Sequence, residues 1–354
     1  MRKQKFKLEF TVKKFLFYII ILAVCVPSLY AEFPDSLDIE LIKTGIGLTL
    51  NEEYKTARSL YSELQVKYPG HPCGPFFMAT VYQAEMKDFE DFQYSQEFTD
   101  NIEFSIELAD ECRDENRHDA WAYYFMGACN LYLALFEGRK GSSWSAARKG
   151  IRAKNLLEKC LDLDSTIYDS YTGLGSFRYW GDVKGGVFAK LPFVGGDRTK
   201  GFEELKKAVE KSYFSRDLAL SALAFIYIQE ERYDIADSLA SALRKKYPLG
   251  KSFLWARAFA NFEAERYEKA LNFFDSLRAE IKEEGQPNNY NLYEISYYKT
   301  LCYFNLEKYT EAMIEIDNAE HLILSDDVRD RLHDMIDEVE EHKDKIREIL
   351  SGSR

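Results

Sequence analysis

Apolar and small residues recur along the chain at steps of three and four, which is the spacing of one face of an α-helix. Four segments repeat one such pattern, in which a tyrosine is followed three residues later by alanine. They read Tyr54-x-x-Ala57-x-x-x-Tyr61-x-x-Leu64-x-x-x-x-Pro69, Tyr233-x-x-Ala236-x-x-x-Ala240-x-x-Leu243-x-x-x-x-Pro248, Tyr267-x-x-Ala270-x-x-x-Phe274-x-x-Leu277 and Tyr309-x-x-Ala312-x-x-x-Ile316-x-x-Ala319. A small residue on such a face lets a second helix approach closely, and a proline after the last turn ends the helix.

A second apolar-periodic segment precedes these helices, with a small residue at a matching position: Gly45, Ala224 or Ala258. The combination resembles the tetratricopeptide repeat, a 34-residue helix–turn–helix unit with small residues at two fixed positions and a proline near its end. Gly45, Ala57 and Pro69 match that pattern, and so do their counterparts in the unit that contains Ala224. The resemblance implies a superhelix of antiparallel helix pairs that binds partners along its concave face.

The middle of the chain fits the same pattern if its units are fourteen residues longer. The small residues that mark these units are Ala79, Gly127 and Gly175, then Ser105, Ala153 and Gly201, then Cys112, Cys160 and Ala208. The extra residues either lengthen both helices of a pair or form a long loop between them.

The predicted fold is therefore all-α, a right-handed superhelical solenoid of about seven helix pairs. Residues 32–37 are a short lead-in, and the repeat domain covers 38–326. Its units are 38–71, 72–119, 120–167, 168–216, 217–250, 251–292 and 293–326. Residues 327–350 form one more helix, charged on most faces, and the segment 327–354 caps the apolar end of the solenoid. No segment shows sustained period-two alternation, so no sheet is expected.

The amino end has the layout of a secretory signal. Residues 1–14 are basic, 15–24 are an unbroken apolar run, and Ala31 follows as a small residue at the expected cleavage site. The apolar run is short for a membrane span, which needs about 20 residues. We therefore expect cleavage after Ala31 and a periplasmic or cell-envelope location. An uncleaved anchor is the alternative, because Leu29 is large for the position two residues before the cleavage site. Lipid attachment at Cys25 is poorly supported, because Val24 is bulkier than the small residue expected before a lipidated cysteine.

Charge and composition narrow the classes of partner. The formal net charge is −12, and without the basic first 31 residues it is −17. Such a balance argues against binding nucleic acid, which requires clustered positive charge. We expect no membrane contact except through an uncleaved signal.

The sequence offers little chemistry. Five cysteines follow the signal, an odd number without a C-x-x-C pair, so we interpret them as small buried residues, with a single disulfide as the alternative. The five histidines are scattered, and no hydrolase elbow, phosphate-binding loop or metal-binding His pair is present. We expect a non-enzymatic protein with no catalytic residues, no metal site and no cofactor.

A Gly-rich insert at 181–201 stands out, with six of the 19 glycines of the chain. Glycine pairs permit close approach of a ligand, and loops of this length are often functional, which makes Asp182, Lys184, Asp197 and Arg198 candidate loop residues. The alternative is structural: Asp197 caps the helix that starts near Thr199, and the apolar residues of the insert fill the solenoid.

The resemblance also implies which residues line the inner groove. The candidate partner-binding residues carried over from it are Phe76, Tyr124, Tyr179, Trp255, Phe259, Phe262 and Tyr297; Ile42, Ile46, Trp121, Phe225 and Phe304 occupy equivalent positions. Their aromatic rings could anchor an extended peptide or a partner helix. Alternatively they pack against neighbouring helices, or the elongated middle pairs fill the groove. Arg178, next to Tyr179, is a further candidate as a groove cation for a ligand carboxylate, with a surface ion pair as the alternative.

The sequence thus predicts an exported scaffold that binds a protein or peptide in an aromatic-lined groove. The alternative is a periplasmic carrier for a small apolar or amphipathic ligand. A hydrolase or transferase that uses the Gly-rich insert is the least supported hypothesis, because no nucleophile–base pair is identifiable.

Overall fold

The computed structural model describes residues 36–182 and 196–352. The chain divides into two units, Met1–Asp38 and Ile39–Arg354, and the description below concerns the second. The signal sequence predicted for residues 1–31 lies outside the described residues.

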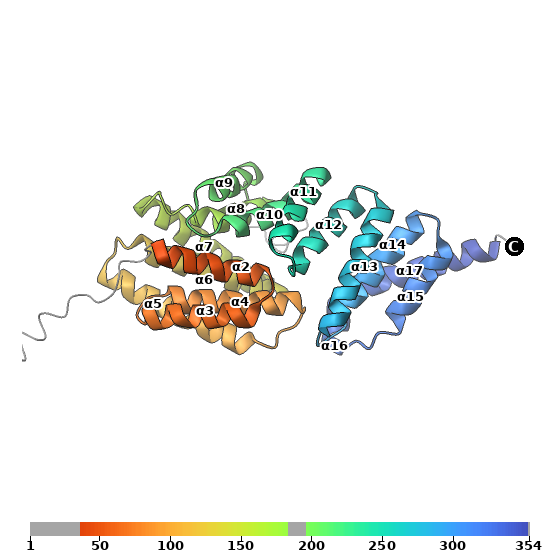
Figure 1. The fold of residues 1–354 in the computed structure, drawn as a ribbon, viewed down its shortest axis with the longest axis horizontal. Helices are drawn as coiled ribbons and strands as arrows, with labels where there is room; N and C mark the ends of the chain where they lie inside the picture. Colours follow the sequence, from red (N-terminus) through yellow and green to blue (C-terminus); the bar gives the residue numbers. More distant parts are fainter. Residues whose placement is uncertain (1–35, 183–195, 353–354) are drawn as a thin grey trace, which may run out of the picture. The chain divides into compact units, whose positions relative to one another are not determined.

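The described residues form helices and no strand, as predicted. The first four pairs are α2 (Ser36–Leu50) with α3 (Tyr54–Lys67), α4 (Cys73–Asp88) with α5 (Ser95–Glu115), α6 (Ala120–Arg139) with α7 (Ser143–Leu163), and α8 (Ser170–Asp182) with α9 (Arg198–Lys211). The next three are α10 (Arg216–Gln229) with α11 (Tyr233–Lys246), α12 (Lys251–Glu263) with α13 (Tyr267–Glu284), and α14 (Tyr290–Asn305) with α15 (Tyr309–Glu320). From α3 to α15 each helix packs against the next, which confirms an all-α helical repeat (Figure 1).

The small residues predicted from the sequence lie where paired helices cross. A Cβ atom on Gly45 would lie 2.3 Å from the Tyr61 ring, and one on Gly201 would lie 2.6 Å from the backbone of Gly175. Ser105, Ala153, Cys160 and Ala208 are buried at equivalent places, and all five described cysteines are free thiols. Of the five, Cys112 is only partly buried.

The longer middle units contain their extra residues in both of the predicted ways, as longer helices and as a longer connection between helices. The second and third pairs lengthen their helices, so that α5, α6 and α7 have 20 or 21 residues each. The fourth pair keeps short helices and places its extra residues between α8 and α9.

Each pair turns through a residue in the left-handed region at the end of its first helix, except the fourth, whose connection lies partly outside the described residues. This residue is glycine only in the third pair (Gly141); in the others it is Glu52, Glu90, Glu231, Glu265 or Glu307, with φ between 47° and 63°. In the fifth pair the amides of Glu231 and Arg232 donate to the carbonyls of Ile228 and Tyr227, which closes the last turn of α10.

The carboxyl-terminal cap consists of two helices rather than the single one predicted. α16 (Asp326–Arg331) and α17 (His333–Gly352) are separated by Leu332, whose side chain is buried against α14 and α15. Val339 and Ile346 of α17 enter the same apolar cluster as Ile316 of α15. The segment therefore covers the apolar end of the last pair, as the capping prediction requires (Figure 1).

Candidate partner-binding surface

The predicted groove residues divide into two sets according to burial. Phe76, Tyr124, Tyr179 and Tyr297 are at most 9% exposed. Phe76 and Tyr124 pack edge to face with each other, and Phe214 of the α9–α10 turn packs against Tyr124. The interior of the longer middle pairs is thus filled by their own aromatic rings, and these residues present little free surface.

Phe214 is held in place by Asp169 at the start of α8. The Asp169 carboxylate accepts hydrogen bonds from the backbone amides of Tyr213, Phe214 and Ser215 at 2.8, 3.1 and 2.9 Å. These amides belong to the turn that ends at Ser215, the N-cap of α10, and the buried Asp169 carboxylate satisfies all three and fixes the turn.

Trp255, Phe259 and Phe262 form the second set, because they are only half-buried. They lie on α12 beside Tyr298 of α14, whose ring contacts Phe259 and Phe262 at 5.0 and 5.2 Å between centroids. We call these four residues the α12–α14 aromatic surface. Behind it, the buried Phe274 stacks on Tyr298 at 5.5 Å, which fixes the orientation of the exposed rings.

Arg178 does not offer a free cation. It is 6% exposed, and its guanidinium pairs with Glu158 and with the buried Glu204. Two carboxylates therefore already neutralise the charge that a ligand carboxylate would need.

The described ends of the Gly-rich insert have structural contacts. Asp197 caps α9 by accepting a hydrogen bond from the Lys200 amide at 2.9 Å, as the structural alternative predicted. Arg198 pairs with Glu230 at 2.6 Å and lies over the Tyr179 ring. Asp182 is an exposed residue at the end of α8, whereas Lys184 lies outside the described residues.

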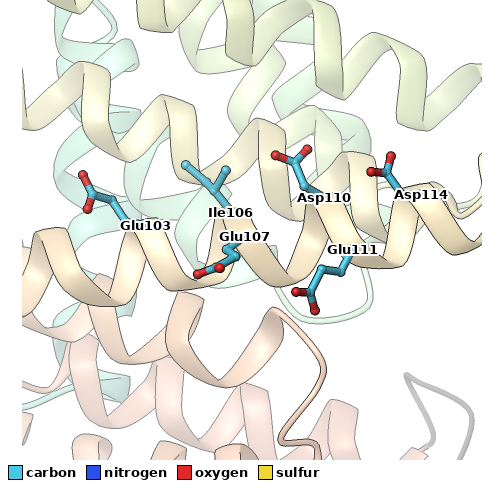
Figure 2. A pocket seen from close by; sticks show the side chains of 6 residues that line it. All are labelled: Glu103, Ile106, Glu107, Asp110, Glu111 and Asp114. Carbon is cyan, nitrogen blue, oxygen red and sulfur yellow. The ribbon is translucent and has the colours of Figure 1, made fainter.

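Two hollows on the described surface are lined mainly by charged side chains. One, of about 440 Å³, lies along α5, where five acidic side chains and Ile106 line it (Figure 2). The other, of about 420 Å³, lies between α7, α8 and α9 and includes Arg178, Glu204 and Lys207. Neither hollow includes a residue of the α12–α14 aromatic surface.

A cluster that sequence reasoning missed joins the first two pairs to the sixth. The Lys251 ammonium at the start of α12 pairs with Glu52, with Asp88 at 3.1 Å and with Glu284 at 3.0 Å. Burial raises the pKa of Glu52 to about 8 and that of Asp88 to about 6, and the negative charges of neighbouring carboxylates add to both shifts. The three carboxylates lie close enough to hold a metal ion, but the Lys251 ammonium already supplies a cation among them.

Neighbouring turns strengthen this junction. The Asn288 and Asn291 side-chain amides donate to the carbonyls of Phe89 and Asp88, both at 2.8 Å. Arg331 of α16 pairs with Glu90 at 3.1 Å. Sequence periodicity does not connect residues this far apart, so it could not predict the junction. The sequence does show a Glu at each of several turns, two residues before Tyr54, Tyr233, Tyr267 and Tyr309.

Glu294 of α14 is the other site residue that sequence reasoning missed. Burial raises its pKa to about 8, and the nearby Glu90 charge adds to the shift while Lys87 opposes it. Among the residues that the structure describes, none makes an ion pair or hydrogen bond with the Glu294 carboxylate. Its position four residues before Tyr298 could have signalled a shared helix face.

None of the described helices combines the length and the apolar composition needed to cross a lipid bilayer.

No protein-family model matches the chain, and no curated protein shows significant sequence similarity to it. Solved structures that are similar to it include the following two. Yeast Tom70 is 14% identical with a TM-score of 0.40, over 91% of this chain and 67% of that one. The P58(IPK) TPR domain is 14% identical with a TM-score of 0.29, over 90% of this chain and 99% of that one. At these values the similarities carry no inference about function, and the fold rests on the helix pairs described above.

Proposed function

We propose that the chain is an exported, non-enzymatic scaffold that binds a protein or peptide partner. The observation that carries this proposal is the α12–α14 aromatic surface, in which Trp255, Phe259, Phe262 and Tyr298 remain half-exposed on a rigid support. Large aromatic rings anchor protein interfaces because they bury much apolar area at little cost in side-chain entropy.

The position of this surface supports a macromolecular partner. Helical repeats present extended faces on which a segment of another chain contacts several successive helices. Of the predicted groove residues on α4, α6 and α8, Phe76, Tyr124 and Tyr179 are packed internally, so the proposed contact concentrates on α12 and α14. A carrier for an apolar molecule would require an apolar pocket, whereas the two hollows described above are lined mainly by charged residues.

Export is part of the proposal and rests on the sequence of residues 1–31. Amino-terminal sequencing of the protein purified from its own host should give Glu32 as the first residue. A first residue of Met1 in a membrane-bound protein would favour the uncleaved anchor.

Site-specific photo-crosslinking tests the binding function. A photoreactive phenylalanine analogue at Phe262 should yield a discrete crosslinked partner in intact cells, and the same analogue at Val66, which is 82% exposed on α3, serves as the control. The partner is then identified by mass spectrometry, purified and titrated. We expect the combined change of Phe259→Ala and Phe262→Ala to weaken its binding at least tenfold. Equal crosslinking from both positions, or unchanged affinity in the double variant, would refute the aromatic surface as the site.

A further inference from the structure

One stripe of α14 combines aromatic rings with a carboxyl group that makes no ion pair among the described residues. Tyr290, Glu294 and Tyr298 are spaced four residues apart, which places them on one face of the helix. Glu294 is half-buried between the two tyrosines, and Tyr298 belongs to the α12–α14 aromatic surface. The carboxylate therefore borders the rings proposed to contact the partner.

Charges of both signs lie near Glu294. Glu90 acts on it from the α4–α5 turn and is itself paired with Arg139 and Arg331, both at 3.1 Å. Glu263 of α12 acts on the neighbouring Tyr298 hydroxyl. Lys87 of α4 is the nearby cation, but its ammonium lies over the Phe225 ring, 6.0 Å from the centroid, rather than in an ion pair with Glu294.

A half-buried carboxylate without a partner is costly, because burial removes solvation that no hydrogen bond replaces. Burial therefore raises the pKa of Glu294 to about 8, so the carboxyl group keeps its proton near neutral pH. A cation brought beside it would restore the charged form of Glu294 and form an ion pair with it.

We propose that the α12–α14 aromatic surface recognises a basic segment of its partner, with a Lys or Arg side chain on Glu294 and adjoining apolar side chains on Phe259, Phe262 and Tyr298. This inference rests on the proposed function and specifies the chemistry of the partner. An acidic segment would add negative charge beside Glu294 and keep its carboxyl group protonated, so it would gain no ion pair there. A purely apolar segment would bury Glu294 further without compensation.

Selection from a displayed library of random twelve-residue peptides tests the inference on the full mature chain. Enriched peptides should carry Lys or Arg next to aromatic or aliphatic residues. A synthetic copy of the most enriched peptide should bind Glu294→Gln at least tenfold more weakly, because a charged hydrogen bond is lost. Glutamine preserves the shape of the neutral side chain, so the variant is expected to fold normally. Glu283→Gln on the exposed face of α13 is the matched control and should bind as the native protein does.

Two further measurements sharpen the test. Calorimetry at pH 7 in buffers of different ionisation enthalpy should show release of up to one proton on peptide binding, and this release should vanish in Glu294→Gln. Lys87→Gln should tighten binding severalfold, because it removes a competing cation.

The outcomes distinguish this inference from the proposed function. If neutral or acidic peptides are enriched and Phe262→Ala abolishes their binding, the scaffold function stands and the basic partner is refuted. Unchanged affinity in Glu294→Gln also refutes it. If no peptide is enriched while a retained apolar molecule is found by native mass spectrometry, the scaffold function itself fails.

Discussion

The Lys251 ammonium lies 3.1 Å from the Asp88 carboxylate and thereby joins the start of α12 to the end of α4. Backbone contacts reinforce this junction, since the Leu249 amide donates to the Asn51 side chain at 3.0 Å. The apolar residue Leu50 packs in the same region against Tyr247 and Phe253. The first two helix pairs are thus fixed to later ones by contacts that a simple stack of neighbouring repeats does not have.

Lys251→Met tests the strength of this junction. Methionine keeps the apolar stem but leaves three carboxylates without their cation, so we expect a loss of about 3 kcal/mol or more in the free energy of unfolding. Urea unfolding measures the loss, and hydrogen exchange should quicken first at residues 50–53 and 88–91. Adding Glu52→Gln and Asp88→Asn should restore much of the stability. Failure of that rescue would show that the charges are not the cause.

The same cluster predicts a dependence on pH. The pKa values of Glu52 and Asp88 are raised to about 8 and about 6, so the folded protein retains protons that the unfolded chain releases. The stabilisation that these two protonated groups give the folded state is complete below the ordinary carboxyl pKa. It is lost as the pH rises through about 6, for Asp88, and then through about 8, for Glu52. Glu294 adds a contribution of the same sign. Melting temperatures between pH 5 and 9 should fall more steeply in the native protein than in the variant with Glu52→Gln and Asp88→Asn. Parallel curves would contradict the raised values.

Gly201→Ala tests the close crossing of α8 and α9. The new methyl group would lie 2.6 Å from the Gly175 carbonyl and from the Tyr179 amide, both of which belong to the backbone. Because the helices must separate, we expect a loss of about 3 kcal/mol by urea unfolding. Gly70→Ala is the control, since nothing lies within 4 Å of its added methyl. Similar stabilities for the two variants would rule out the tight crossing.

Glu265→Gly tests the turn geometry. Glu265 is exposed with φ of 57°, a conformation that costs a non-glycine residue roughly 1–2 kcal/mol. Glycine removes this strain but loses more backbone entropy on folding, so we expect the free energy of unfolding to rise by about 0.5 kcal/mol. Ala279→Gly, in the interior of α13, should instead lose about 1 kcal/mol. Destabilisation by both changes would mean that the Glu265 side chain contributes more than its backbone strain costs.

The helix pairs could be predicted because their determinants are local. Tyrosine and alanine at steps of three and four define the faces, and residues such as Gly175 and Gly201 admit close crossings whatever the remaining surface does. The single cap helix was predicted incorrectly, because the burial of Leu332 depends on α14 and α15 and not on the periodicity of its own segment.

The candidate surface was only partly predictable. Trp255, Phe259 and Tyr124 follow the same helical spacing, yet the first two are half-exposed and Tyr124 is buried beneath Phe214. Helical spacing assigns a residue to a face, but the neighbouring elements decide whether that face is covered.

The sequence by itself determined the all-α repeat, because periodicity and small residues act within one or two helices. Only the tertiary structure decided which aromatic rings stay accessible, that Arg178 is neutralised, that Glu294 makes no ion pair among the described residues, and that Lys251 joins helix pairs distant in sequence. Each of these properties depends on the burial and charge contributed by residues far along the chain, and local patterning does not encode them.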